Sequence, residues 1–407
     1  MVSTITPTAV DEDDFRTFHE VALPARLTAG NGALAYADVA ALGSIAITTP
    51  AGSYTFRPAD GTVEVLAGDE HADTVIGLDL DSWRGLIADL DTAPGLFYGG
   101  RATVVRGKPL RFVRWEPGLR AMFHGLPPFD PETADLRDLD GAPLDCTATF
   151  AFADVDRDAA AMRHFLGTAG YLVVREVFTR DEIAGLVHDT ETMRADATPG
   201  NGASWWGRNA EGDEVLCRVL DANRFERFRA LGADPRILRL LTIAPEPLRP
   251  RNPDRQDSGT VLWKIPNVTE GLADLPWHRD CGMGGHAKNC PTIIMTICLT
   301  TGTPEGGELR ALPGSHRGSF PFIDGRDAKA PTGVPLRVTA GDVSLHYSDV
   351  MHASLAPTSA EGPHRISALL AFVPPDAGHH RGERHYNDVL LGQPDGQVEH
   401  LADRLAH

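Results

Sequence analysis

The chain has 407 residues, enough for two or three compact domains, and its 42% hydrophobic and 23% charged residues are those of an ordinary globular protein. Its formal net charge of −18 leaves no basic footprint, so neither nucleic acid nor an anionic lipid surface is expected as a partner. The sequence begins without a basic, apolar leader, has no apolar run of membrane-spanning length, and places its 5 cysteines in no CxxC pair, so we expect a reduced, cytoplasmic location without membrane insertion.

The first part of the chain, up to about residue 125, alternates β-rich segments with turns. Pro, Gly and Asp separate these segments, as in a meander of short strands. We expect the strands at residues 43–47, 53–57, 62–66 and 73–80. Asp81 predicts the N-cap of a helix that continues to Leu90, because apolar residues recur there at i, i+3, i+4 and i+7. An α+β accessory domain over residues 1–125 follows from this order.

Two further segments of this domain indicate a β-hairpin. Residues 101–106 and 110–114 alternate in polarity on either side of Gly107 and Lys108, and a short connection between two such runs is typical of hairpins. The carboxylates of this part fall in expected turns. We therefore expect no catalytic site within residues 1–125.

A connection rich in Pro, Asp and Gly separates the two parts of the chain. It covers residues 126–155 and predicts a linker. The remaining residues, 156–407, form the second predicted domain. From residue 260 onward this domain shows short β-rich segments with closely spaced turn signals, which predict a mainly-β double-stranded β-helix, the jelly roll or cupin fold.

Helices are expected at the flank of this core. Residues 156–170 have a helical pattern, and residues 171–175 follow as a short strand. Thr179 and Glu182 have the spacing of a capping box, which predicts the start of a second helix.

A glycine-rich stretch at residues 199–219 carries Trp205, Trp206 and Arg218. We interpret it as a loop over the mouth of the barrel whose aromatic and cationic side chains contact substrate. The alternative is a surface loop whose tryptophans pack on the barrel wall, and the residues favour neither.

The metal-binding chemistry of the sequence lies in the segment LPWHRDCGM. His278 and Asp280 stand at i and i+2, so a regular strand would point both side chains to one face. A third ligand must come from elsewhere, and His352, in the segment GDVSLHYSDVMHAS, is the best candidate. Two imidazoles and one carboxylate leave three coordination positions open, as in non-haem Fe(II) oxygenases.

Two neighbours of these ligands have less certain roles in the sequence. His346 shares strand parity with His352, which predicts either a side chain that supports the metal ligands or a core histidine. Arg279, between the two first ligands, points away from the metal in a regular strand and is a candidate substrate contact at the rim of the site.

An arginine follows the third ligand. Arg365 and Ser367 stand on one face of the next expected strand. An arginine at this place can pair with a carboxylate through two hydrogen bonds. The residues thus indicate an anion site beside the metal site.

Residues of about 160–375 resemble the phytanoyl-CoA dioxygenase family in the order and spacing of several motifs. These are the entry segment HFLGTAGYLVVREVF, the element VLWKIPN before the HxD pair, and the turn PGSH within GGELRALPGSHRGSF. The resemblance implies a Fe(II) enzyme with 2-oxoglutarate and O2 as cosubstrates.

The resemblance also implies roles for individual residues. His278, Asp280 and His352 fall on the family's iron ligands, and Arg365 falls on its 2-oxoglutarate-binding arginine. Four more side chains fall near the cosubstrate. Ser354 matches a serine that binds it, Thr296 lies on the strand that lines its pocket where an aromatic residue is usual, Ser367 either contacts it or packs, and Lys264 either reaches the same carboxylate or is a surface lysine.

The function implied by this resemblance is oxidation of an unactivated C–H bond of a small metabolite, by hydroxylation, desaturation or ring closure, with release of succinate and CO2. Bacterial specialised or lipid metabolism is the expected setting. Related iron halogenases carry Ala or Gly in place of the carboxylate ligand, so Asp280 argues against halogenation. An alternative is a cupin isomerase or hydrolase with another divalent metal, for which Arg365 and Ser367 would be unnecessary.

The N-terminal part, residues of about 15–125, resembles a sterol-carrier-protein-type domain through LDLDSW and YGGRATVVRGKP. This resemblance implies an apolar tunnel, and an unrelated α+β accessory domain is the alternative. It also raises a second function, a lipid-binding or transfer protein with a vestigial oxygenase barrel. A small-molecule substrate is the expected partner, and a homo-oligomer is left open.

Overall fold

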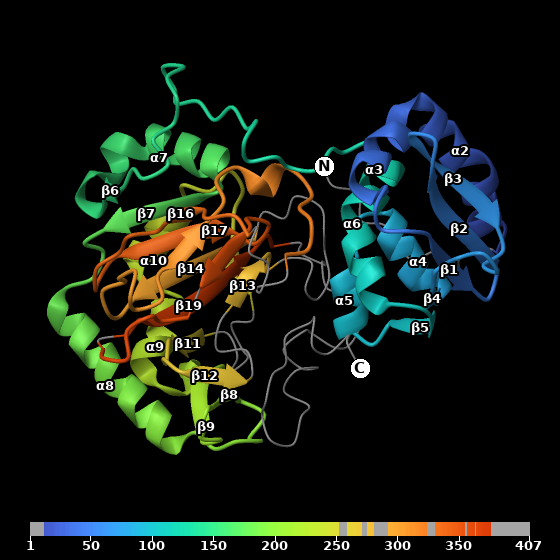
Figure 1. Cartoon of the computed structure of the whole chain (residues 1–407). Coiled ribbons are helices and arrows are strands. Elements are labelled where there is room, and N and C mark those ends of the chain that lie inside the picture. Colours follow the sequence, from blue (N-terminus) through green and yellow to red (C-terminus); the bar gives the residue numbers. More distant parts are fainter. Residues whose placement is uncertain are drawn as a thin grey trace.

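The computed structural model describes residues 12–251, 259–270, 275–280, 292–323, 330–354, 356–362 and 364–375. These residues form two lobes, which lie side by side in Figure 1. We call residues 12–124 the N-terminal lobe and residues 150–375 the C-terminal lobe. Strands of the described residues form one five-stranded sheet in the first lobe, and a ten-stranded and a four-stranded sheet in the second.

The N-terminal lobe is built around its five-stranded sheet. The strand order is β3 (Thr62–Ala67), β2 (Gly52–Ala59), β1 (Ile45–Thr49), β4 (Thr74–Leu78) and β5 (Ala102–Arg106). Strand β1 pairs antiparallel with β2 and parallel with β4, so the sheet is mixed. The helical segments are α1 (Glu12–Thr17), η1 (Phe18–Ala22), α2 (Leu23–Arg26), η2 (Leu27–Asn31), α3 (Gly32–Val39), α4 (Leu80–Ile87), α5 (Ala93–Tyr98) and α6 (Pro109–His124).

Two expectations for this lobe are wrong in detail. The helix after β4 is capped by Asp79, whose side chain accepts a hydrogen bond of 2.6 Å from the Ser82 amide, so Asp81 lies in the first turn instead of at the cap. The expected hairpin does not form, because residues 109–124 are the helix α6. Pro109 presets the backbone of its first turn.

The alternation at residues 110–114 was too short to reveal this helix. Almost every residue of α6 from Phe112 to Phe123 is buried, and the large apolar side chains among them are Phe112, Trp115, Leu119, Met122 and Phe123. These side chains enter the apolar core of the N-terminal lobe together with Phe15, Phe56 and Trp83. Burial of nearly the whole helix in this core therefore outweighed a local alternation over residues 110–114.

The helical entry to the C-terminal lobe confirms the sequence expectations. Helix α7 (Val155–Ala169) leads into strand β7 (Tyr171–Arg175), and helix α8 (Arg180–Asp196) follows. Thr179 and Glu182 form both hydrogen bonds of a capping box at the start of α8. The remaining helical segments of this lobe are η3 (Phe152–Asp154), η4 (Ala222–Arg224), α9 (Glu226–Leu231), α10 (Pro235–Leu241) and η6 (Ser315–Arg317).

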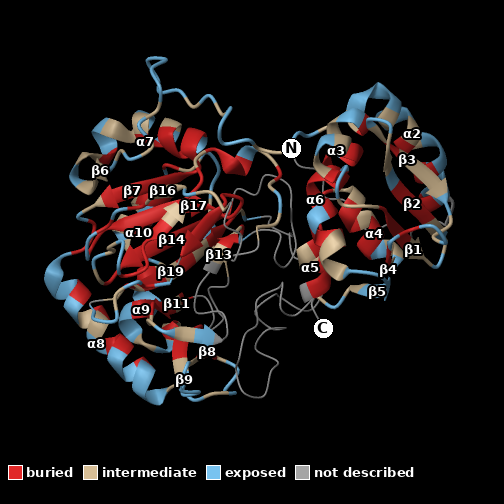
Figure 2. Cartoon of the chain, in the orientation of Figure 1, coloured by how far each residue is buried: buried red, intermediate tan, exposed pale blue. Residues whose placement is uncertain are grey.

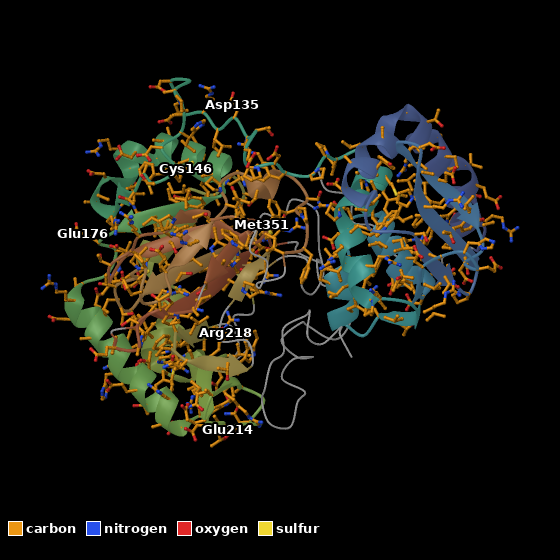
Figure 3. The ribbon with its side chains drawn as sticks, in the orientation of Figure 1. Asp135, Cys146, Glu176, Glu214, Arg218 and Met351 are labelled. Carbon is orange, nitrogen blue, oxygen red and sulfur yellow. The ribbon has the colours of Figure 1, made fainter. Side chains whose placement is uncertain are left out.

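The glycine-rich stretch at residues 199–219 is not the expected loop. It forms strands β8 (Ser204–Asn209) and β9 (Glu214–Val219), which pair antiparallel within the ten-stranded sheet. Glu214 and Arg218, labelled in Figure 3, both lie on β9. Gly212, with φ of +85°, serves the tight turn between the two strands, so a glycine that indicated a long loop in the sequence belongs to a hairpin.

The chain of the C-terminal lobe alternates between two separate sheets, in the manner of a jelly roll. The ten-stranded sheet contains β12 (Val268–Glu270), β8, β9, β11 (Gly259–Trp263), β19 (Ile366–Val373), β14 (Ile293–Cys298), β17 (Val343–Tyr347), β7 and β6 (Phe150–Ala151), with β10 (Arg249–Pro250) beside β19. The four-stranded sheet contains β13 (Leu275–His278), β18 (His352–Ser354), β15 (Leu309–Ala311) and β16 (Val334–Pro335). Because the chain crosses repeatedly between the sheets from β13 to β19, the expected mainly-β core is present.

The large sheet of this lobe is buried on both faces, as Figure 2 shows for its central strands. One face is apolar and belongs to the core cluster that includes residues of α7 and α8, with Met295 on β14 and Leu345 on β17. The alternate residues of the same strands include buried polar side chains, Thr296, Ser344 and His346. The helices therefore cover the apolar face, and the polar residues point to the interior of the jelly roll.

The connection between the lobes packs along the C-terminal lobe. The Phe129 amide donates a hydrogen bond of 2.7 Å to the Ser319 carbonyl, and the Tyr171 hydroxyl donates one of 2.7 Å to the Cys146 carbonyl.

Among the described residues, no helix combines the length and the apolar character needed to cross a membrane.

Gly170 ends α7 in a left-handed conformation, with φ of +87°, and a methyl group there would lie 2.4 Å from Val350 and 2.5 Å from His316. We expect Gly170→Ala to lower the free energy of unfolding by about 2 kcal/mol, because it adds backbone strain to a steric clash. Gly167→Ala, one turn earlier in the same helix, has open space and is expected to raise it by up to about 1 kcal/mol. Urea denaturation measures both values, and equal midpoints for the two variants would contradict the prediction.

Candidate metal centre

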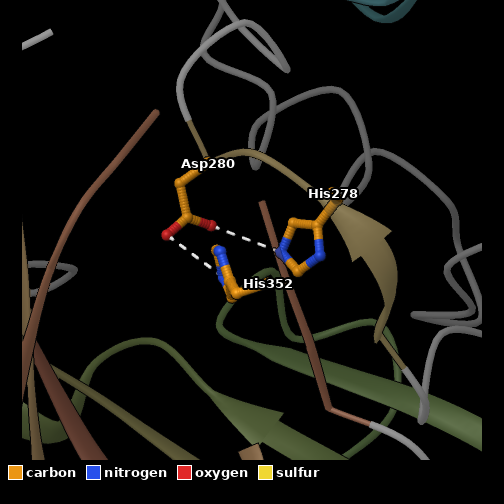
Figure 4. Close-up of side chains that lie close together, drawn as sticks. All are labelled: His278, Asp280 and His352. Carbon is orange, nitrogen blue, oxygen red and sulfur yellow. Dashed lines mark ion pairs between the residues drawn. The ribbon is translucent and has the colours of Figure 1, made fainter. Parts of the chain in front are cut away.

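Three predicted ligands meet at one end of the small sheet. His278 ends strand β13, His352 begins strand β18, and these two histidines are register partners in the antiparallel pair. Asp280 follows two residues after His278. Its Oδ1 lies 3.5 Å from Nε2 of His278 and its Oδ2 lies 3.7 Å from Nε2 of His352, as Figure 4 shows. One ligand atom from each of the three residues lies within 4.8 Å of the others, a spacing that suits a single metal ion.

Backbone carbonyl groups orient both histidine rings. Nδ1 of His278 donates to the Pro276 carbonyl at 2.7 Å, and Nδ1 of His352 donates to the Val350 carbonyl at 2.9 Å. A carbonyl oxygen can only accept, so in each neutral ring the proton sits on Nδ1. The lone pair of each Nε2 is then directed to the third ligand, as a metal requires.

The electrostatics of the cluster favour the protonation states in which these residues bind metal. Desolvation would raise the pKa of Asp280, but the interactions of this carboxyl with His352, His278 and His346 outweigh it, so this pKa lies well below its ordinary value. Burial, reinforced by His278, lowers the pKa of His352 well below its ordinary value. A carboxylate beside a neutral imidazole is the donor set that a divalent cation needs.

His346 lies beside this cluster, on strand β17. Its Nε2 is 3.4 Å from Oδ2 of Asp280, and its ring centroid is 4.4 Å from that of His352. The side chain is buried among the polar residues of the jelly-roll interior. The strand parity that suggested a supporting role in the sequence thus places His346 against the carboxylate ligand.

Arg365 is buried on the opposite sheet, directly before β19, and contacts two of the predicted serines. Nη2 donates to the Ser354 hydroxyl, Nη1 donates to the Ser367 hydroxyl at 3.4 Å, and Nε donates to the Gly307 carbonyl at 3.1 Å. Burial lowers the pKa of Arg365 to about 10, so the group remains a cation at neutral pH. All of these recorded acceptors are neutral, and no carboxylate of the described residues forms an ion pair with it.

Lys264 approaches the same serine from strand β11. The side chain is 1% exposed, which excludes the surface lysine that the sequence left open, and Nζ donates to the Ser354 carbonyl. Thr296 lies on the polar face of β14, where its register partners are Ser344 and Leu369. Ser354 is two residues from His352, so the predicted cosubstrate residues lie close to the triad.

The residues that the sequence suggested as substrate contacts are buried or half-buried in other contacts. Trp205 is 2% exposed, belongs to the same apolar cluster as the core of the N-terminal lobe, and has the Arg218 guanidinium 4.8 Å from its ring centroid. Trp206 is half-buried and packs on the core of the C-terminal lobe, with Nε1 donating to the Ser204 hydroxyl at 2.8 Å. Arg279 is buried and forms an ion pair with Glu116 of helix α6.

Sequence reasoning missed Glu116, because residues 1–125 showed no cluster of residue types typical of a catalytic or metal site. One signal was present. Glu116 is the only acidic residue of helix α6, and its neighbours Trp115 and Pro117 are buried with it. A carboxylate on the apolar face of a helix needs a partner.

The comparisons with known proteins bear on the C-terminal lobe. The model of the family described as phytanoyl-CoA dioxygenase matches residues 166–366. A search of curated proteins found no match. With the His–Asp–His cluster, the family match confirms the expectation of Fe(II) and 2-oxoglutarate as cofactor and cosubstrate.

Solved structures similar to this chain include EvdMO1, AviO1 from Streptomyces viridochromogenes Tue57, and HygX from Streptomyces hygroscopicus with nickel and 2-oxoglutarate bound. EvdMO1 is 24% identical with a TM-score of 0.43, and the match covers 53% of this chain and half (50%) of EvdMO1. AviO1 is 25% identical with a TM-score of 0.41, over 55% of this chain and 98% of AviO1. HygX is 19% identical with a TM-score of 0.40, over 54% of this chain and 88% of HygX.

The family model begins in the last turn of α7 and includes strand β7, the HxD segment, the PGSH turn and the second histidine, so it contains most of the motifs that suggested the resemblance. Residues 166–366 of this chain are therefore a phytanoyl-CoA dioxygenase family domain, and His278, Asp280 and His352 form a candidate metal site within it.

Proposed function

We propose that this protein is a Fe(II)- and 2-oxoglutarate-dependent dioxygenase that oxidises an unactivated C–H bond of a small metabolite, in bacterial specialised or lipid metabolism. The observation that carries the proposal is the buried cation Arg365 beside an intact His–Asp–His cluster. A buried guanidinium whose recorded acceptors are all neutral is costly, and a carboxylate ligand would remove that cost.

The residues of the cluster fit a metal in both number and chemistry. Nε2 of His278, Nε2 of His352 and the carboxylate of Asp280 would hold Fe(II) and leave coordination positions for other ligands. Bound Fe(II) with 2-oxoglutarate supplies activation of O2, coupled to release of succinate and CO2. The protein fixes the two imidazoles through the carbonyl groups of Pro276 and Val350, so that their lone pairs stay directed at the ion.

The cosubstrate would be oriented by Arg365. Its guanidinium would bind the carboxylate of 2-oxoglutarate remote from the metal, with Ser354 and Ser367 as further hydrogen-bonding groups. Lys264 would add a second positive charge on the same side, and Thr296 would line the site from β14. Because the guanidinium is already held by Ser354 and Gly307, little side-chain entropy is lost on binding.

The type of oxidation is narrowed by Asp280. A carboxylate ligand occupies the position that a halide would need, which favours hydroxylation, desaturation or ring closure over halogenation.

Trp206 and Arg218 stay predictions as substrate contacts. Trp205 stays one as well, although its burial beside the core of the N-terminal lobe offers a second explanation for its side chain.

We expect His278→Ala to abolish Fe(II)-dependent formation of succinate from 2-oxoglutarate, because two ligands bind the ion too weakly to retain it. Succinate is measured by mass spectrometry across a panel of small metabolites, and treatment with a chelator should reduce the wild type to the same level. His188→Ala, at an exposed position of α8, is the matched control and should leave the rate unchanged. A His278→Ala protein with wild-type turnover, or a metal-loaded wild type that neither binds nor consumes 2-oxoglutarate, would refute the proposal.

We expect Arg365→Lys to raise the Kd for 2-oxoglutarate on the order of 10-fold to 100-fold, because a lysine keeps the charge but loses the two-pronged hydrogen bond. Calorimetric titration of Fe(II)-loaded protein without oxygen measures this Kd. Arg310→Lys is the control. Arg310 is half-buried on β15 and pairs with Glu308, so its substitution should leave cosubstrate binding as it is. Equal Kd values for the two variants would assign the anion site elsewhere.

A further inference from the structure

Helix α6 of the N-terminal lobe contacts the segment that carries two of the metal ligands. Nη2 of Arg279 donates to Oε1 of Glu116 at 3.2 Å, and each side chain is 9% exposed. Arg279 stands between His278 and Asp280. In Figure 1, α5 and α6 occupy the side of the N-terminal lobe that faces β13. The lobes are thus joined by a buried ion pair one residue from the metal centre.

We propose that Glu116 is a positioning residue for the metal centre. Through its ion pair with Arg279, Glu116 holds the ligand segment 278–280 in place and makes the N-terminal lobe part of the catalytic unit. This inference rests on the proposed function only in taking His278 and Asp280 as metal ligands. It assigns Arg279 a role that differs from the substrate contact suggested by the sequence.

The ligand segment needs such an anchor because the sheet does not hold all of it. Strand β13 ends at His278, and its register with β18 shifts between Leu275 and His278. Asp280 therefore lies beyond the ladder that fixes His278. The Arg279 side chain is directed at the other lobe, so its ion pair fixes the backbone between the two ligands from the opposite side.

Glu116 is itself held firmly. Its Oε2 accepts a hydrogen bond of 3.0 Å from the Ala93 amide at the start of α5, and Arg120 lies one helical turn further along α6. Arg120 forms a buried ion pair of 2.9 Å with Asp89. A carboxylate fixed by a second helix and by neighbouring charges is a rigid acceptor for Arg279.

The same helix also lies within electrostatic range of Asp349, which precedes His352 in the chain. Burial would lower the pKa of Arg120, but the charges of Asp89, Glu116 and Asp349 outweigh it and raise this pKa. Asp349 is buried and lies three residues before His352. Met351, labelled in Figure 3, lies on the side of the C-terminal lobe that faces the N-terminal lobe. One turn of α6 thus carries Glu116, which contacts the segment 278–280, and Arg120, on which the charge of Asp349 acts.

The test compares the metal affinity of variants of the full chain. Co(II) is the probe, since its visible absorption reports coordination at the triad without cosubstrate or turnover. We expect Glu116→Gln to weaken Co(II) binding on the order of 10-fold to 100-fold, as loss of a group that orients a metal ligand does. Asp91→Asn is the matched control, because Asp91 is a buried carboxylate of the same lobe that pairs with Arg101 at 2.9 Å, and it should leave the affinity unchanged.

A double-mutant cycle separates positioning from a general loss of stability. If Glu116 acts through Arg279, then Glu116→Gln has no further effect on Co(II) affinity in an Arg279→Gln background. Arg279→Lys keeps the charge and should retain more affinity than Arg279→Gln, a comparison that holds even where Glu116→Gln fails to fold. Wild-type affinity in Glu116→Gln, an undiminished effect in the Arg279→Gln background, or equal affinities for Arg279→Lys and Arg279→Gln would overturn the proposal.

The same experiment keeps the two proposals distinguishable. A wild type that binds Co(II) but does not bind 2-oxoglutarate would refute the proposed function and leave the role of Glu116 to be decided by the affinities. In Fe(II)-loaded protein, the charge-transfer absorption of the Fe(II)–2-oxoglutarate complex should shift in Glu116→Gln and not in Asp91→Asn. An unshifted band together with unchanged Co(II) affinity contradicts positioning by Glu116.

Discussion

The antiparallel pairing of β13 with β18 sets His278 opposite His352, and the rest of the site depends on this register. A shift of one residue would turn one imidazole away from the other. The carbonyl groups of Pro276 and Val350, each two residues before a histidine, then fix both rings in the same tautomer. The short strands of the small sheet thus supply two candidate ligands with equivalent backbone acceptors, and Asp280 lies beside both from beyond the end of β13.

The large sheet supplies the second requirement, a polar interior. Its strands alternate between an apolar face under the helices and a face that carries Thr296, Ser344, His346 and Ser367. Arg365 lies directly before β19 and donates a hydrogen bond to Ser354 of the small sheet, so the proposed anion site would include residues of both sheets. The groups that accept hydrogen bonds from Arg365 are neutral, so its positive charge is not compensated by them. An anionic ligand would compensate this charge.

The N-terminal lobe has a closer relation to this site than a separate accessory domain would have. Its core of aromatic side chains extends to Trp205 and Leu220 of the C-terminal lobe, and its helix α6 reaches Arg279 through Glu116. Buried charges are costly unless they are paired in good geometry. The buried ion pair between Arg279 and Glu116 therefore couples the relative position of the two lobes to the geometry of the segment 278–280.

The sequence by itself pointed to the candidate triad, to Arg365 and to the entry helices, because the HxD spacing, the capping box and the order of the family motifs can be read along the chain without knowledge of the fold. It did not reveal that residues 110–114 belong to a helix or that residues 199–219 form a hairpin, since burial against distant segments overrides a short local pattern. Only the tertiary structure showed which groups Lys264, Arg279 and Glu116 contact. Each is a charged residue whose meaning depends on its partner, and those partners, Ser354 for Lys264 and an ion pair between Arg279 and Glu116, lie 90 and 163 residues away in the chain.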